Sequence, residues 1–165
     1  MVELNPDKAH YIVATVIIVK EGKYLITKRA DWEKAFPSKW TVPGGKLAKK
    51  DYLERKPDTN AGQWYNILET LAEREVFEET ALKIKNIKYL ANLTFIRPDG
   101  IPTIVISLYA DYESGQVVLP IDLTDFKWVS LDELKNYDLI DGIYEEIEML
   151  DKHLKGEKIG IWQKE

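Results

Sequence analysis

Cysteine is absent from this sequence, and histidine occurs only at His10 and His153. The lack of cysteine excludes disulfide scaffolds and thiolate metal sites and fits a reducing compartment, so we expect a cytoplasmic protein. Two histidines so far apart in the chain do not suggest a zinc site. The sequence has no apolar run of transmembrane length and no secretion signal, so we expect no membrane partner.

Positive charge is also in the minority, since the formal net charge is −5 at pH 7. This balance gives no electrostatic reason to expect a nucleic-acid polymer as partner, although it does not exclude a nucleotide held by metal ions. The 165 residues are 45% hydrophobic, which predicts one globular domain, residues 1–165, with a substantial core.

Segments rich in β-branched residues predict strands, and segments with helical periodicity predict helices. The helices are expected near 51–56, after the capping-box pattern Ser130-Leu131-Asp132-Glu133, at 143–154, and at 64–82. The strands are expected at 11–19, 23–28, 40–42, 83–96, 103–112, 117–119 and 126–129. Strands, a helix, more strands and more helices indicate an α/β fold, with one mixed sheet sandwiched between helices.

The predicted helix at 64–82 changes character along one face. Its apolar stripe consists of Trp64, Leu68, Leu71 and Ala72, and the same stripe continues into Glu75, Glu78 and Glu79. Like charges at these spacings repel one another, each pair by roughly 0.2–0.5 kcal/mol on an isolated helix. They also face the negative end of the helix dipole.

A divalent cation would remove these penalties. Hard cations such as Mg²⁺ and Mn²⁺ take oxygen ligands, and carboxylates together with substrate phosphates commonly hold Mg²⁺. The alternative is that Arg74 and the three glutamates form an ordinary exposed patch of a charged helix.

Two stretches together carry a resemblance to a known family: Pro43-Gly44-Gly45-Lys46, and Arg74 through Leu82. The chain resembles the Nudix hydrolases (MutT-like), whose motif is G-x5-E-x7-R-E-U-x-E-E-x-G-U, where U is a bulky aliphatic residue. Gly45 stands at the opening glycine, the R-E-U-x-E-E portion is intact, and Leu82 is the closing aliphatic residue. The resemblance covers roughly residues 11–154 and implies the Nudix fold.

The resemblance also implies a chemistry, the metal-dependent hydrolysis of a phosphoanhydride in a nucleoside diphosphate linked to another group. It assigns Mg²⁺ or Mn²⁺ to Glu75, Glu78, Glu79 and the carbonyl of Gly44, and it has Arg74 orient Glu78. Glu78 itself, Asp122 and Asp125 are candidates for catalysis, and Arg29, Gly45 and Lys46 are candidates for substrate binding. The alternatives are solvated loop acids at 122 and 125, a helix glutamate as the base, and plain surface cations at 29 and 46.

The motif departs from the family pattern at three points. Arg74 lies twenty-nine positions after Gly45 rather than the family's fourteen, so an inserted loop is expected at about 46–63. Counting back from Arg74, the first motif glutamate falls on Asn66, and the late glycine is Ala81. We expect the insertion to cover the non-phosphate part of a small nucleotide substrate or to contact a second subunit, as in a homodimer. The alternative is a passive solvated loop. These departures also leave open a non-catalytic nucleotide-binding module on the same fold.

Overall fold

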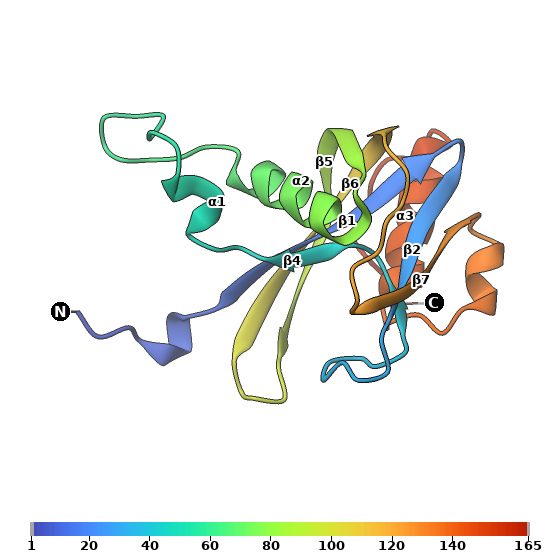
Figure 1. The fold of residues 1–165 in the computed structure, drawn as a ribbon, viewed down its shortest axis with the longest axis horizontal. Coiled ribbons are helices and arrows are strands. Elements are labelled where there is room, and N and C mark those ends of the chain that lie inside the picture. The colour runs from blue at the N-terminus through green and yellow to red at the C-terminus, as the bar shows by residue number, and fades with distance from the viewer. Residues whose placement is uncertain (1, 165) are drawn as a thin grey trace.

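The computed structural model describes residues 2–164 and contains a seven-stranded mixed sheet with helices on both sides (Figure 1). Its strands are β1 (Tyr11–Lys20), β2 (Lys23–Arg29), β3 (Trp40–Thr41), β4 (Gly44–Lys46), β5 (Lys83–Ile96), β6 (Pro102–Ser114) and β7 (Leu123–Val129). Its α-helices are α1 (Lys50–Leu53), α2 (Ile67–Thr80) and α3 (Ile143–Leu154), and its 3-10 helices are η1 (Pro6–Lys8) and η2 (Glu133–Asn136).

The sheet follows the order β3-β2-β1-β6-β5, with β4 paired to β1 and β7 paired to β2. The β1–β6 pair is parallel, and the other strand pairs are antiparallel. Glu21 and Gly22 form the turn between β1 and β2 with φ angles of 50° and 73°. Two successive positive φ angles are typical of the tight hairpin turns that match strand twist.

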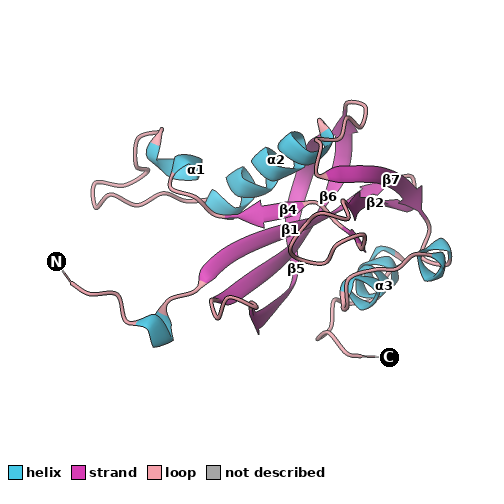
Figure 2. Cartoon of the chain, turned by 60° about the horizontal axis from the view of Figure 1, so that its bottom comes forward, coloured by secondary structure: helices cyan, strands magenta, loops and turns pink. Residues whose placement is uncertain are grey.

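Each face of the sheet packs against one long helix (Figure 2). On one face, Leu71 and Val76 of α2 lie in a core cluster with Val16 of β1. On the opposite face, Ile147 of α3 lies in a second cluster with Ile17 of β1. Neighbouring residues of β1 therefore point to opposite faces and supply both cores, as strand geometry requires. The predicted α/β arrangement of one mixed sheet between helices is confirmed.

The predicted helix at 64–82 is shorter than expected. It begins at Ile67 because Asn66 adopts a left-handed conformation, and it ends at Thr80 because Ala81 does the same. Trp64 lies outside the helix, where its indole N–H donates to the carbonyl of Arg55 at 3.0 Å. The buried stripe of α2 continues through Val76 and Thr80. Glu75, Glu78 and Glu79, which we call the acidic turn, therefore border the apolar stripe rather than replacing it.

Other element predictions differ in detail. Residues 117–119 form no strand, and the stretch from Gly44 to Lys46 forms β4, which the Pro-Gly-Gly pattern concealed. The capping box is present, since the Ser130 N–H donates to the Glu133 carboxylate at 2.8 Å, but it begins a 3-10 helix. Over residues 2–164, none of the helices has the length and apolar character needed to cross a membrane.

Candidate active site

Two glycines allow strand β4 to lie directly beneath the C-terminal half of α2. Gly44 and Gly45 pair with Thr15 and Ala14 of β1, so their backbone is held by the sheet. A Cβ atom at Gly45 would overlap the carboxylate of Glu75. Glycine is therefore required here for close approach of backbone and carboxylate, rather than for an unusual φ angle.

Glu79 is the most deeply placed carboxylate of the acidic turn. It accepts a hydrogen bond from the N–H of Gly44 at 3.1 Å. Burial raises the pKa of Glu79 to about 8, and the nearby carboxylates of Glu75 and Asp122 add to the effect, while the Gly44 hydrogen bond and Arg29 oppose it. Burial also raises the pKa of Glu75. In both groups burial outweighs the nearby positive charge of Arg74 or Arg29, and a bound cation would supply more.

Arg74 connects the acidic turn to the short helix α1. Its guanidinium forms ion pairs with Glu75 at 2.9 Å and Glu78 at 3.0 Å, and it donates to both carboxylate oxygens of Asp51. The Asp51 side chain is fully buried. Burial alone would raise its pKa, but hydrogen bonds from Arg74 and from the N–H of Ala48 outweigh burial and leave the pKa below its ordinary value.

The donor set suits a hard divalent cation. Glu75, Glu78, Glu79 and the backbone of Gly44 offer oxygen atoms only, which is the ligand type of Mg²⁺ and Mn²⁺. Within residues 2–164, the acidic side chains do not form a convergent cluster of three, because Arg74 holds Glu75 and Glu78 while Glu79 bonds to Gly44. The residues fit the metal chemically, and for all three glutamates to bind one ion, Glu75 and Glu78 must turn from Arg74 towards Glu79.

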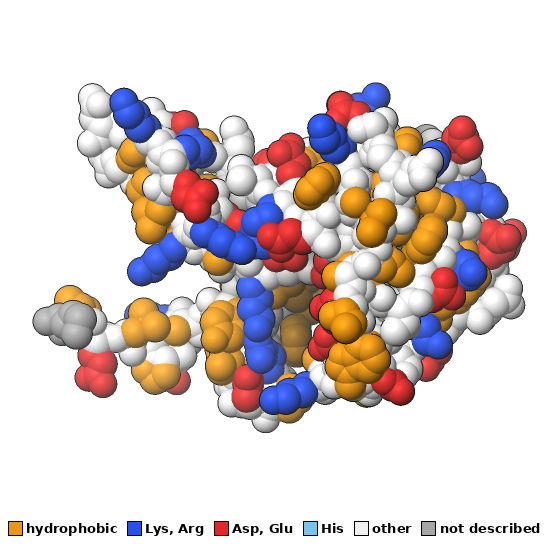
Figure 3. Space-filling model, in the orientation of Figure 1, with side chains coloured by type: hydrophobic (Ala, Val, Ile, Leu, Met, Phe, Trp, Pro, Cys, Tyr) orange, Lys and Arg blue, Asp and Glu red, His pale blue; other side chains and the backbone are white. Residues whose placement is uncertain are grey.

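A hollow opens below α2 and β4, with basic side chains along one edge and acidic ones along another (Figure 3). Next to the hollow, part of the sheet face that carries α3 has no helix over it. Tyr11 and Phe95 flank Thr103 there in a row across β1, β6 and β5, and they are 42% and 37% exposed. Large exposed apolar side chains in a concave region commonly mark a ligand site.

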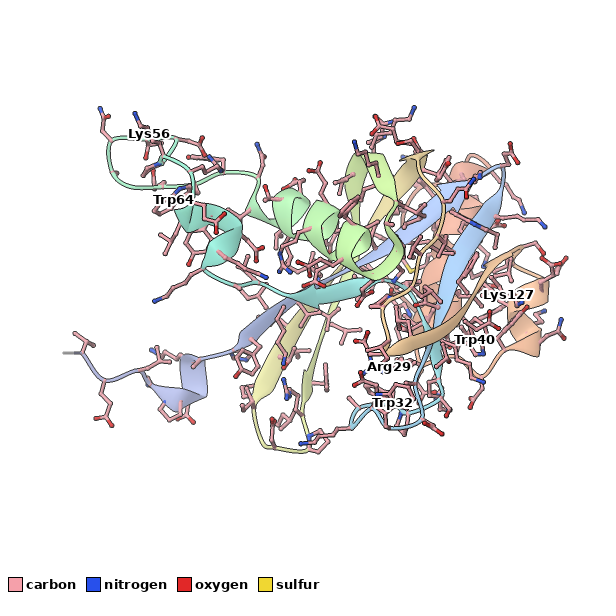
Figure 4. The ribbon with its side chains drawn as sticks, viewed as in Figure 1. Arg29, Trp32, Trp40, Lys56, Trp64 and Lys127 are labelled. Carbon is pink, nitrogen blue, oxygen red and sulfur yellow. The ribbon has the colours of Figure 1, made fainter. Side chains whose placement is uncertain are left out.

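Arg29 lies at the end of β2, and Figure 4 places it beside Trp32 in the loop that follows. Its guanidinium donates to the carbonyl of Ala35 at 2.7 Å and to Glu33 at 3.1 Å. Its charge also lowers the pKa of Glu79, while the Asp122 carboxylate raises it. The N–H of Ala30 donates to the carbonyl of Asp122 at 2.9 Å, so Asp122 lies next to Arg29, and the charges of both act on Glu79.

A comparison with models of known protein families shows which family this chain belongs to. The NUDIX domain model matches residues 8–150. The chain belongs to the NUDIX family. The fold agrees: the MutT protein from Methanosarcina mazei superposes with a TM-score of 0.66 at 24% identity, covering 90% of this chain and 98% of that protein. The NUDIX domain of Shewanella oneidensis NrtR, in complex with ADP ribose, has a TM-score of 0.66 at 20% identity and covers 92% and 94%.

Curated relatives match over a shorter stretch. The NAD-capped RNA hydrolase NudC of Actinobacillus succinogenes is 41% identical over 66 residues, which are 39% of this chain and 24% of that protein. The NudC of Mannheimia succiniciproducens is 39% identical over 66 residues and shares the same coverage, 39% and 24%. The matched region therefore spans about a quarter of each relative.

The structure revises one position of the NUDIX motif. Asn66 was expected at the first glutamate, but its side chain makes no cap hydrogen bond, and Asp51 is the carboxylate that contacts Arg74. Counting forward from Gly45 with the family spacing G-x5-E lands on Asp51. The family spacing therefore did point to Asp51 when counted from Gly45. Counting back from Arg74 gave Asn66 instead, because that count runs into the inserted residues. The inserted residues therefore lie after Asp51.

Two other predicted site residues lie elsewhere than expected. Asp125 pairs with Lys28 in the sheet and contacts Lys127 at 3.8 Å, and it alternates with Phe126 and Trp128, which face α2. Asp125 therefore points away from α2, to the face that carries α3, which is also the face of Tyr11 and Phe95. Lys46 is exposed with its ammonium 5.1 Å from the ring centre of Tyr11, at the hollow's open sheet face rather than beside Glu79.

Proposed function

We propose that this NUDIX protein is a metal-dependent hydrolase that cleaves a phosphoanhydride bond in a nucleoside diphosphate linked to another group. The observation that carries the proposal is the pair of partly buried carboxylates, Glu75 and Glu79, against the Gly44–Gly45 backbone. Withdrawing two carboxylates from water is costly where positive charge does not outweigh the loss of hydration, and the pKa of both groups is raised despite Arg74 and Arg29. A cation-dependent active site accounts for that cost.

Glu75, Glu78, Glu79 and the Gly44 carbonyl would hold Mg²⁺ or Mn²⁺. When bound, such an ion neutralises phosphate charge and lowers the pKa of a bound water. Arg74 has the separate role of positioning Glu75 and Glu78, because it contacts both carboxylates while Asp51 fixes its guanidinium.

Asp122 is the proposed general base, because it lies next to Arg29 and its charge acts on Glu79, whereas Asp125 points to the face that carries α3. A carboxylate beside the reacting phosphate would take the proton of the attacking water. Arg29 would bind phosphate oxygens on the same side. Lys46 would meet the substrate at the open sheet face, where Tyr11 and Phe95 offer rings for a nucleobase.

The NudC relatives are named as hydrolases of NAD-capped RNA, and the NrtR domain is in complex with ADP ribose. Both molecules contain a diphosphate with an organic group at each end. We therefore propose nucleotide derivatives of this class as substrates. The prediction that no nucleic-acid polymer binds is checked by including NAD-capped RNA in the substrate panel.

The test is to replace single carboxylates without changing side-chain size. Glu79→Gln and Glu78→Gln should each lower kcat by about 100-fold or more while the protein still folds, because each removes a charge from the metal site. Glu73→Gln, an exposed position on the same helix, is the matched control and should keep wild-type turnover. Wild-type activity in excess chelator, or in either variant, would refute the proposed mechanism.

The alternative function is a nucleotide-binding module without catalysis. Two features supported this alternative, the insertion and the apparent loss of the first motif glutamate at Asn66. The second no longer supports it, because Asp51 supplies a carboxylate that contacts Arg74. A module of this kind would bind ADP ribose in calorimetry and release no product from it with Mg²⁺ or Mn²⁺.

A further inference from the structure

Residues 47–66, which we call the insertion lobe, are held by their own hydrogen bonds. The Asp58 carboxylate accepts from the Arg55 guanidinium at 2.8 Å and from the Tyr65 N–H at 2.7 Å, and Arg55 also donates to the Tyr65 carbonyl at 2.7 Å. The rings of Tyr52 and Trp64 pack with their centres 5.3 Å apart. The lobe therefore has a defined surface of its own rather than a solvated, unpaired backbone.

A groove of about 270 Å³ lies where the lobe meets α2. Lys50, Asp51, Tyr52, Glu54 and Arg55 form its wall on the lobe, and Thr70 and Arg74 form its wall on α2. This volume is slightly below the roughly 300 Å³ at which ligand pockets begin. It fits a sugar or a single ring system rather than a whole nucleotide.

The groove leads to the acidic turn. Thr70, Arg74 and Glu78 follow one another at four-residue steps, so they form one stripe of α2, and the distance from Thr70 to Glu78 is about 12 Å along the helix axis. Glu75 and Glu79 lie on the neighbouring stripe that faces β4. The acidic turn is thus bordered by the groove along one stripe and by β4, with the hollow beneath it, along the other.

Lys50 marks the junction between the groove and the acidic turn. Its ammonium lies 3.8 Å from the Glu78 carboxylate, and its side chain is 57% exposed. A long, flexible cation at this point can leave Glu78 and contact a phosphate oxygen. The charge is therefore complementary to a phosphate that enters the groove from the acidic turn.

We propose that the groove binds the second organic group of a two-ended diphosphate substrate, a sugar- or ring-sized group, with Lys50 on the adjoining phosphate. This inference rests on the proposed function and narrows it. Substrates with an organic group on both sides of the diphosphate would use the hollow and the groove together. A nucleoside triphosphate would leave the groove empty, because its far end is a bare phosphate.

The experiment blocks the groove with a larger side chain on α2. Thr70 is exposed, so Thr70→Trp adds a ring to the groove wall without disturbing the core, and Glu73→Trp adds the same ring at an exposed position outside it. The ratio of kcat/KM for a two-ended diphosphate to that for a nucleoside triphosphate should fall about tenfold in Thr70→Trp and stay at the wild-type value in Glu73→Trp. A dinucleotide and a nucleotide sugar are assayed separately, because they distinguish a nucleoside from a sugar in the groove.

A second pair of variants tests the charge. Lys50→Met removes the ammonium and keeps side-chain length, and Lys56→Met does the same at a lobe lysine outside the groove lining (Figure 4). Lys50→Met should raise the KM for two-ended diphosphates about fivefold, and Lys56→Met should leave it at the wild-type value. Melting curves are to be recorded for all four variants, and each should show a cooperative unfolding transition.

Calorimetry separates this inference from the proposed function. The dissociation constant of the two-ended diphosphate, measured in chelator, should rise in Thr70→Trp. Equal constants in the wild type and Thr70→Trp, or no binding by the wild type, would overturn the groove site. Weakened binding in Thr70→Trp, combined with no hydrolysis of any substrate by the wild type, would support the groove and overturn the hydrolase.

Discussion

Ala81 shows how a single residue carries backbone strain that the family usually avoids. It ends α2 with φ 60° and ψ 12°, and its N–H bonds to the carbonyl of Phe77 at 2.8 Å. The left-handed conformation costs a residue with a Cβ roughly 1 kcal/mol relative to glycine. The chain has accepted that strain rather than changing the turn.

Ala81→Gly should therefore stabilise the protein by about 1 kcal/mol, because glycine is the usual residue at a left-handed helix end. For a chain of this size, the melting temperature would rise by about 2–4 °C. Calorimetric melting curves make the comparison, with Ala72→Gly inside α2 as a control that should be destabilised. A lower melting temperature for Ala81→Gly would show that the left-handed conformation carries no strain.

Glu146 is a buried acid outside the proposed metal site. It is 4% exposed and accepts a hydrogen bond from the Ser107 hydroxyl at 3.0 Å, while its second carboxylate oxygen has no hydrogen-bond partner among the described residues. Burial raises its pKa from 4.5 to about 7, and the charge of Glu145 adds to the rise. The folded state therefore keeps the proton up to a higher pH than the unfolded state does.

The sign of the pH dependence follows from that difference. The contribution of Glu146 to stability is fully present below pH 4.5 and is lost as the pH rises towards about 7. The loss amounts to about 3 kcal/mol. Glu146→Gln should remove this part of the pH dependence and be more stable than the wild type above pH 7, as measured by urea unfolding in chelator. Parallel stability curves for the two proteins between pH 4.5 and 8 would contradict the prediction.

At the scale of elements, Asp51 joins α1 to α2. Its buried carboxylate binds Arg74, which in turn contacts Glu75 and Glu78, so a residue next to the insertion holds the acidic turn in place. This arrangement is consistent with the inserted residues following Asp51 rather than preceding it. Replacing residues 48–61 by a Gly-Ser link would remove Asp51 with the loop, so a loop-shortening experiment must begin after α1.

Asp51→Asn should lower stability by about 2 kcal/mol, because it leaves the partly buried Arg74 without its main partner. Asp58→Asn is the matched control, since the Arg55–Asp58 pair is exposed and should change stability much less. Urea unfolding measures both. Replacing residues 54–63 by a Gly-Ser link should keep the Asp51 contact and most of the stability. Equal losses in the two point variants would show that the Asp51–Arg74 pair does not hold the helices together.

At the scale of the whole molecule, a ligand of the folded state alone raises stability by mass action. If Mg²⁺ or Mn²⁺ binds the acidic turn, a concentration a hundred times the dissociation constant adds about 2.7 kcal/mol. The melting temperature should then rise by about 5–10 °C in millimolar Mn²⁺. Chelator should reverse the shift, and Glu79→Gln should abolish it. An unchanged melting temperature in the wild type would leave the glutamates as an ordinary charged patch.

Much of the fold followed from local patterns. Residues 83–96 and 143–154 form β5 and α3 with the predicted bounds, because strand and helix periodicities are local properties of the chain. The Pro43-Gly44-Gly45-Lys46 stretch and the R-E-U-x-E-E stretch together indicated the family, and the second places glutamates next to the helix face that packs on the sheet. Composition was sufficient to exclude disulfides and thiolate metal sites.

Tertiary structure decided what depends on distant partners. The spacing from Gly45 points to Asp51, but its contact with Arg74 exists only once α1 packs against α2 across the inserted residues. Asp122 and Asp125 looked equivalent in sequence, but the register of β7 on β2 turned Asp125 to the opposite face, since alternate residues of a strand point in opposite directions. The depth of Glu79 is likewise a property of the packed helix and sheet, because burial exists only once both are in place.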